Sequence, residues 1–196
     1  MNSRPLPVLN PILSKLSLTL DEACTTYEAA NDIVEYCAPV LHNLLKKHPL
    51  DVQNLVQDLE WPQAHDTTYT RRRLLEAKNG QWSIYAICWL PGHYTPVHDH
   101  GTWGVVGVLQ GCLYEHQMAY IEKNEEAQKY HLAPAGVTLL SEQAINTFVP
   151  EPDHIHRSGV PMNAEATASL HLYGRVMTHY HAYDLKQHTR SRLDVE

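Results

Sequence analysis

The sequence predicts an all-β barrel or sandwich preceded by a helical segment, and three observations lead to this fold class. Residues 20–58 carry apolar side chains at helical spacing. After Asp66 the pattern changes to short β-type segments, and the first two flank an Asn79-Gly80 pair that favours a hairpin. Many short strands joined by glycine and proline turns are typical of sandwiches and barrels.

The helical segment divides into three expected helices. The first begins where Asp21 and Glu22 would favour a helix N-terminus, because the helix dipole attracts negative charge there. A second helix is expected over 40–47, with Pro49 as its end, and a third over 52–59.

The β region is expected to hold the barrel, over about residues 67–184, after helices over about 20–60. The tail after Asp184 is polar and is expected to be loosely held. We therefore interpret residues 1–196 as a single domain. The expected strands are 67–75, 82–89, 104–110, 113–119, 128–132, 136–140, 145–148, 153–157 and 167–173.

Composition excludes several classes of function. A net charge of −7 argues against sequence-independent binding to nucleic acid, which needs a basic surface. No apolar run approaches the ~20 residues that span a bilayer, and the first residues do not resemble a signal peptide. The four cysteines are scattered without a Cys-x-x-Cys motif. They are expected to be free thiols in the cytoplasm.

Three histidine pairs have the spacing His-x-His, which on a strand points both rings to one face. In a chain with 14 histidines some pairs arise by chance, so context has to separate them. The first pair follows Pro91-Gly92 and precedes a buried run, and the second follows a turn. The third has one tyrosine between its histidines and another after them, and it is typical of a closing strand or a surface segment. The pairs are His98/His100, His154/His156 and His179/His181.

The first pair resembles the opening motif of the cupins, which are double-stranded β-helix (jelly-roll) barrels. Gly92 precedes His98 by six positions, and a glycine ends the following run at Gly111. Cupins usually place a metal-binding glutamate four residues after the second histidine, where this chain has Gly104. Three neutral imidazoles would leave the full charge of a divalent metal to be offset by substrate, and a thiolate would do so.

Five blocks in order resemble the cysteine dioxygenase family, cupins that convert a small thiol to its sulfinic acid with O₂. They are "YTRRRLLEAKNG", "ICWLPGHYTPVHDH", "LQG", "HIHR" and "SLHLY", between Tyr69 and Tyr173. The resemblance implies an Fe(II) site in which His156 joins His98 and His100 as the third ligand. His154 is then a neighbour of the site.

The block "SLHLY" also carries a pattern of its own. Alternation puts Ser169, His171 and Tyr173 on one face of a strand and the two leucines on the other. A Ser–His–Tyr row can act as a hydrogen-bond relay in which the serine fixes the imidazole and the imidazole orients the phenol. The other interpretation is that Tyr173 simply ends the strand with its hydroxyl in water.

An arginine is expected to bind the substrate carboxylate, because its planar fork can bind bidentately. Counting back from the Asn79-Gly80 hairpin, the resemblance selects Arg72 for this role, whereas matching "YTR" selects Arg71. We favour Arg72, whose parity separates it from Arg71 and Arg73. All three could also be surface charges.

The chain departs from the family at two places. Mammalian members carry a cysteine that crosslinks to the active-site tyrosine, and Gly104 stands there, so no Cys–Tyr bond is expected, as in the bacterial branch. Cysteine-oxidising members often continue with Ser-Pro-Pro after "SLHLY", whereas Gly174-Arg175-Val176 follows here. This admits 3-mercaptopropionate as a substrate, although the arginine favours cysteine, because the mercaptopropionate enzymes usually have glutamine in its place.

The sequence therefore predicts an iron-dependent thiol dioxygenase that acts on a small thiol carboxylate, foremost L-cysteine. Oxidation of 3-mercaptopropionate or another thiol acid is the first alternative. A non-catalytic cupin that binds a small acid is an alternative of another class, and it would not need the Ser–His–Tyr row. Another cupin enzyme, such as an isomerase, is disfavoured by the absent glutamate.

Overall fold

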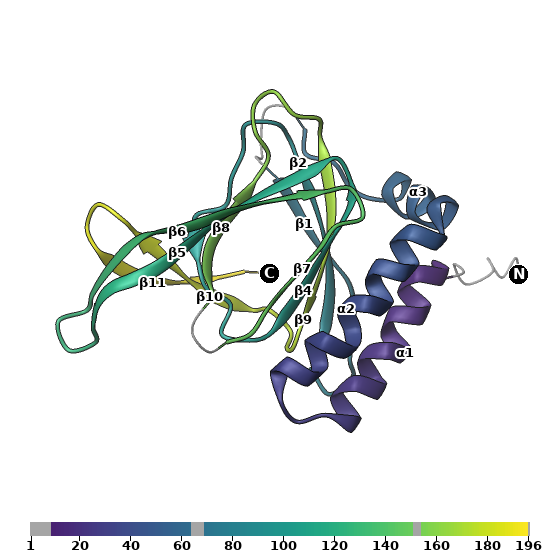
Figure 1. Cartoon of the computed structure of the whole chain (residues 1–196), viewed down its shortest axis with the longest axis horizontal. Coiled ribbons are helices and arrows are strands. Elements are labelled where there is room, and N and C mark those ends of the chain that lie inside the picture. Colours follow the sequence, from purple (N-terminus) through teal and green to yellow (C-terminus); the bar gives the residue numbers. More distant parts are fainter. Residues whose placement is uncertain (1–8, 64–68, 151–153, 196) are drawn as a thin grey trace, which may run out of the picture.

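Three helices cover one face of a β-sheet (Figure 1). The computed structural model describes residues 9–63, 69–150 and 154–195. Packing of the second helix, residues 30–47, against two strands, residues 104–110 and 145–148, joins the helices to the sheet. None of the described helices is both long and apolar enough to span a membrane. The helices are α1 (Pro11–Thr26), α2 (Ala30–Lys47) and α3 (Pro49–Gln57).

The helix boundaries correct the prediction at three points, the first of which is that Pro49 begins α3, three residues before the expected start. Helix α1 begins at Pro11, with the Asn10 side chain accepting the Ile12 N–H at 2.9 Å, so Asp21 lies late in this helix rather than at its start. Asp21 instead accepts a hydrogen bond from the Trp82 indole at 2.8 Å, which ties the helix to the barrel. Helix α2 runs through Pro39 without a break, because its buried face continues on both sides of the proline.

The helices pack on a five-stranded antiparallel sheet with the strand order β1-β2-β9-β4-β7. The Asn79-Gly80 hairpin between β1 and β2 is present, and Gly80 has a φ of 75°, a left-handed value that glycine adopts readily. The first expected strand started at residue 67, and residues 67–68 lie outside the described ones. The strands are β1 (Tyr69–Glu76), β2 (Ser83–Trp89), β4 (Gly104–Gln110), β7 (Ile145–Phe148) and β9 (Thr167–Tyr173).

A six-stranded antiparallel sheet faces the first, with the order β11-β10-β3-β8-β5-β6. Long strands β5 and β6 form the arm that extends away from the helices (Figure 1). The expected strand 153–157 appears as β8, and residue 153 lies outside the described ones. The strands are β3 (Val97–His98), β5 (Cys112–Asn124), β6 (Lys129–Ser141), β8 (Ile155–Gly159), β10 (His179–Asp184) and β11 (Thr189–Asp194).

Two predictions for this second sheet were wrong. Residues 128–132 and 136–140 belong to one strand, β6, because Pro134 lies on an edge strand, where a missing N–H is tolerated. The tail after Asp184 is not loosely held, since β11 pairs with β10 along its whole length, from His179 opposite Asp194 to Asp184 opposite Thr189.

Strand parity divides the core between the two faces of the five-stranded sheet. On β9, Leu170 and Leu172 pack with the helices, whereas Tyr173 belongs to the cluster inside the barrel. On β2, Ile84 and Ala86 pack against the helices, and the intervening side chains face inward. The predicted all-β cupin-type barrel with an N-terminal helical segment is confirmed, and its interior receives the polar row of β9.

Candidate active site

Three buried histidines meet inside the barrel. His98 lies on β3 directly opposite His156 on β8, and His100 follows β3 in the next loop. The ring centroids are 4.8 Å apart for His98–His100, 4.8 Å for His98–His156 and 4.9 Å for His100–His156. One nitrogen from each ring lies within 4.8 Å of the others, so the three can bind one metal ion.

Burial keeps these imidazoles neutral, which is the form that binds metal. The pKa of His98 is lowered to about 3, first by burial and then by the neighbouring His156. The pKa of His100 is well below its usual value for the same first reason. Burial also lowers the pKa of His156, although a hydrogen bond with Glu115 partly opposes this shift.

The hydrogen bonds of the three rings leave nitrogens for a ligand bond. His98 places Nδ1 3.0 Å from the Pro96 carbonyl, which favours the tautomer with a free Nε2 lone pair. The Nε2 atom of His156 and the Nδ1 atom of His100 are buried without a hydrogen-bond partner among the described residues. Such orphaned atoms are costly in an empty core, so a bound metal fits this cluster.

A buried carboxylate that the sequence analysis missed lies behind His156. The Glu115 side chain on β5 is 1% exposed, and its Oε1 atom lies 2.8 Å from His154 Nε2 and 3.1 Å from His156 Nδ1. Alternation on the expected strand 113–119 could have found it, because Glu115 shares a face with the fully buried Leu113.

The Ser–His–Tyr row of β9 forms a continuous hydrogen-bonded chain. Ser169 Oγ lies 2.8 Å from His171 Nε2, and the Tyr173 hydroxyl lies 3.2 Å from His171 Nδ1. The Trp89 indole donates to Ser169 Oγ at 3.0 Å. Burial lowers the pKa of His171 to about 3 and raises that of Tyr173 above its usual range, so both groups are neutral.

We assign the proton positions along this chain starting from Trp89. The Trp89 indole can only donate, so Ser169 accepts from it. The Ser169 hydroxyl has two acceptors in reach, the Ile87 carbonyl at 3.5 Å and His171 Nε2 at 2.8 Å, and we assign its proton to the nearer one, His171. A neutral His171 then carries its proton on Nδ1 and donates it to the phenol oxygen of Tyr173. The hydroxyl hydrogen of Tyr173 is left to donate elsewhere, and the ring of Tyr173 stacks on that of His100 at 5.3 Å.

A small cavity of about 40 Å³ opens beside the histidines, and Arg71 lines it together with Tyr173. Arg72, which the sequence analysis favoured for the substrate carboxylate, lines a separate depression next to helices α1 and α3. Arg71, the other candidate, is the arginine that lies at the histidine cavity. Tyr69 and Arg71 share the inner face of β1, as their joint contact with the cavity shows.

A family match settles which proteins this chain is related to. The model of the family "cysteine dioxygenase type I" matches residues 27–188, well over half of the chain. This chain belongs to the cysteine dioxygenase type I family. It is therefore an enzyme, a metal-dependent thiol dioxygenase, as the resemblance implied.

Relatives within this family are distant but cover most of the chain. Human cysteine dioxygenase type 1 is 24% identical over 169 residues, which is 80% of this chain and 81% of the human one. The cattle protein of the same name is 26% identical over 167 residues, 79% and 80% of the two chains. Outside these named relatives, a solved structure of a cupin-like protein from Thermotoga maritima is similar to this chain, with a TM-score of 0.45 at 13% identity over 67% of this chain and 97% of the other.

This cysteine dioxygenase family member has no room for a side chain at Gly104. Gly104 lies directly opposite Tyr173 in the β4–β9 pairing, and a Cβ atom there would lie 2.2 Å from the ring of Phe148. Phe148 stacks on His100 with ring centroids 4.6 Å apart. An aromatic ring thus occupies the space beside the tyrosine in which mammalian members were expected to carry their crosslinking cysteine.

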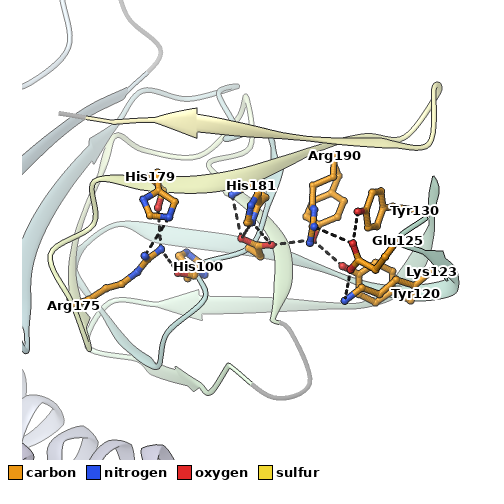
Figure 2. A network of polar contacts seen from close by, with 11 residues as sticks. His100, Tyr120, Lys123, Glu125, Tyr130, Arg175, His179, His181 and Arg190 are labelled. Carbon is orange, nitrogen blue, oxygen red and sulfur yellow. Dashed lines mark hydrogen bonds and ion pairs between the residues drawn. The ribbon is translucent and has the colours of Figure 1, made fainter. Parts of the chain in front are cut away.

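The remaining histidines of the three pairs lie around the cluster rather than in it. His154 contacts His156 at 3.3 Å through Nε2 and Nδ1. His179 and His181 lie on β10, where His181 binds Asp99 at 3.2 Å and Arg175 bridges the carbonyls of His100 and His179 (Figure 2). These contacts brace the loop that carries His100.

Proposed function

We propose that this enzyme oxidises a small thiol carboxylate, foremost L-cysteine, to its sulfinic acid with O₂, using Fe(II) held by His98, His100 and His156. The observation that carries the proposal is one cavity lined by two of the three buried, neutral histidines, by Arg71 and by Tyr173. Ferrous iron supplies a centre at which a thiolate sulfur and O₂ exchange electrons.

The charge of the histidine cluster favours a thiol substrate. Three neutral imidazoles cancel none of the charge on a divalent metal, so an anionic substrate group is stabilised next to them. A thiol in this position loses its proton at neutral pH, because positive charge favours the thiolate. The small size of the cavity likewise favours a short thiol over an aromatic substrate.

Arg71 provides the cation for the substrate carboxylate. Its guanidinium lies 3.9 Å from the centre of the Tyr85 ring, and its Nη2 donates to the Met177 carbonyl at 3.3 Å. These contacts fix the planar group at the cavity wall before substrate arrives. A pre-positioned guanidinium binds a carboxylate at a lower entropic cost than a mobile lysine would.

Tyr173 provides a hydroxyl donor on the reacting side of the cavity. The chain from Trp89 through Ser169 and His171 directs the Tyr173 hydroxyl hydrogen away from His171. This hydrogen can stabilise negative charge that develops on oxygen during its transfer to sulfur. We assign Tyr173 a catalytic role, and His171 and Ser169 the role of orienting it.

The alternative substrate is 3-mercaptopropionate, which lacks the amino group of cysteine. Among the described residues that line the cavity, none is acidic, so an ammonium group has only neutral oxygens as partners there. The sequence Gly174-Arg175-Val176 after β9 also favours 3-mercaptopropionate, whereas Arg71 in the cavity favours cysteine.

None of the four cysteines is disulfide-bonded in the structure, which supports our placing of the enzyme in the reducing cytoplasm.

The proposal is tested by supplying iron-loaded protein with L-cysteine, 3-mercaptopropionate and cysteamine under air. We expect the corresponding sulfinate from cysteine, with kcat/KM above that for 3-mercaptopropionate and far above that for cysteamine. A higher kcat/KM for 3-mercaptopropionate would move the assignment to the alternative. Absence of any sulfinate from protein with a full complement of iron would contradict the proposal.

A further inference from the structure

Glu115 is a fully buried acid whose carboxylate is held from three directions. His154 Nε2 and His156 Nδ1 approach Oε1 at 2.8 and 3.1 Å, and Asn146 donates to Oε2 at 2.9 Å. His154 is itself held by stacking on Phe148, with centroids 4.6 Å apart and planes 4° from parallel. A buried carboxylate with this many partners has a single orientation.

Among the described residues, the Glu115 carboxylate faces only nitrogen atoms that can donate a hydrogen bond, namely Asn146 Nδ2, His154 Nε2 and His156 Nδ1. A carboxylate that accepts from all three has its oxygens satisfied in the ionised form.

The two ring nitrogens of His156 lie in different surroundings. Its Nδ1 contacts Glu115, and its Nε2 is buried and has no hydrogen-bond partner among the described residues. A neutral imidazole that donates from Nδ1 to a carboxylate has its lone pair on Nε2, and this arrangement raises the basicity of the nitrogen that binds metal.

We infer that Glu115 is a positioning residue of the metal centre, which fixes the tautomer and orientation of His156 and places a negative charge behind an all-histidine ligand set. The inference rests on the proposed function for the identity of the ligands. Gly104 stands where a cupin ligand glutamate was expected, so no carboxylate comes from that position. Glu115 supplies a charge from the layer behind the ligands instead, and its effect reaches the metal through the imidazole of His156.

The test is a direct measurement of metal affinity in the full-length protein, without turnover. Metal-free protein is titrated with Co²⁺ and, under anaerobic conditions, with Fe²⁺ against a competing chelator, and the cobalt absorption spectrum is recorded. Glu115→Gln keeps the size of the side chain and removes its charge, so we expect the Kd to rise about 10–100-fold. Glu122→Gln on the exposed part of the same strand is the matched control, with an unchanged Kd.

A double-mutant cycle separates positioning from a general effect on folding. If Glu115 acts through His156, adding Glu115→Gln to His156→Ala causes no further loss of affinity. A further loss as large as in the wild-type background would overturn the inference, as would an unchanged Kd in the single variant. Two metal ions bound by wild type and one by Glu115→Gln would also overturn it, because Glu115 would then be a ligand of a second site.

Glu115→Asp covers the case in which Glu115→Gln does not fold. The shorter side chain keeps the charge but moves it away from His156, so we expect a weaker metal affinity than in wild type. An unchanged metal affinity would count against the inference.

Failure of this inference can be distinguished from failure of the proposed function. Wild type that makes no sulfinate while Glu115→Gln still weakens metal binding contradicts only the function.

Discussion

The guanidinium carbon of Arg71 lies over the ring of Tyr85, 3.9 Å from its centre, on the inner face of the five-stranded sheet. Tyr85 lies edge-on to Tyr173 with ring centroids 5.9 Å apart, and it pairs in register with His171. The positive charge of Arg71 also opposes, in part, the rise that burial causes in the pKa of Tyr173. The cation and the phenol of the site are thus held by one shared aromatic ring.

Arg71→Ala is expected to impair the oxidation of thiol carboxylates far more than that of cysteamine, which has no carboxylate. Loss of a charge-assisted contact with a buried partner commonly costs roughly 2–5 kcal/mol. Steady-state kcat/KM for cysteine and cysteamine in the two proteins measures this change in preference.

Arg72→Ala is the matched control, since the neighbouring residue lines a different depression. Its preference between cysteine and cysteamine should equal that of wild type. If Arg72→Ala changes the preference and Arg71→Ala does not, the side chains have been assigned to the wrong faces of β1.

Removing any one of the three clustered histidines should strip most of the bound iron. His98→Ala, His100→Ala and His156→Ala each delete one imidazole, while the apolar core on either side of the sheet remains. Elemental analysis measures the loss of iron, and the far-ultraviolet circular dichroism spectrum measures whether the fold is retained. His179→Ala, outside the cluster, should keep near wild-type iron, and an equal loss there would show that the effect is not specific to the ligands.

Tyr173→Phe removes one hydroxyl and keeps the ring that packs on His100. Iron loading should survive, and turnover should fall by roughly 10²–10⁴-fold, the usual range for a positioned proton donor. More O₂ should also be consumed per sulfinate formed. An oxygen electrode combined with product analysis measures both quantities, and normal, fully coupled turnover would reduce the Ser–His–Tyr chain to a structural role.

The stability of the metal-free protein should fall as the pH is lowered from about 6.5 to 4.5. Burial lowers the pKa of His171 to about 3, whereas an unfolded histidine titrates near 6.5. In this window the unfolded state binds more protons than the folded state, so acid favours unfolding by up to about 1.4 kcal/mol per pH unit for this group. Glu115, with its lowered pKa, adds a loss of the same sign only at lower pH.

Urea unfolding of wild type and His171→Gln across this pH range measures the slope. The variant lacks the titrating ring, so its free energy of unfolding should depend less steeply on pH. Parallel curves for the two proteins would mean that His171 is not kept neutral by burial.

Local pattern was enough to predict β9, which carries the Ser–His–Tyr row, and two further strands of its sheet, but not β3, which carries His98. The boundaries expected for 104–110, 145–148 and 167–173 coincide with β4, β7 and β9. Glycine or proline lies close to both ends of β4 and β9, whereas β7 has a proline only after its end. The start of α1 differs from the prediction, since the cap at Asn10 lies eleven residues ahead of Asp21. A local charge preference is weaker than the burial of a whole helix face.

The contacts of Arg71 and Glu115 could not be predicted from the sequence. Alternation correctly divides Arg71 from Arg72, but which face of a strand points inward depends on the sheet that packs against it. Glu115 lies on a strand whose burial pattern could be inferred, yet its partner His156 comes from β8, 41 residues later in the chain. Contacts of this kind are fixed only by the pairing of β5 with β8.

The measurement that tests the central claim most directly is the fate of heavy-isotope O₂ during a single turnover of iron-loaded protein with L-cysteine. If the histidine cluster, Arg71 and Tyr173 form a thiol dioxygenase site, both oxygens of the sulfinate carry the label, and one O₂ is consumed per sulfinate. A product labelled at one oxygen or at none, or a disulfide in place of the sulfinate, would contradict the account.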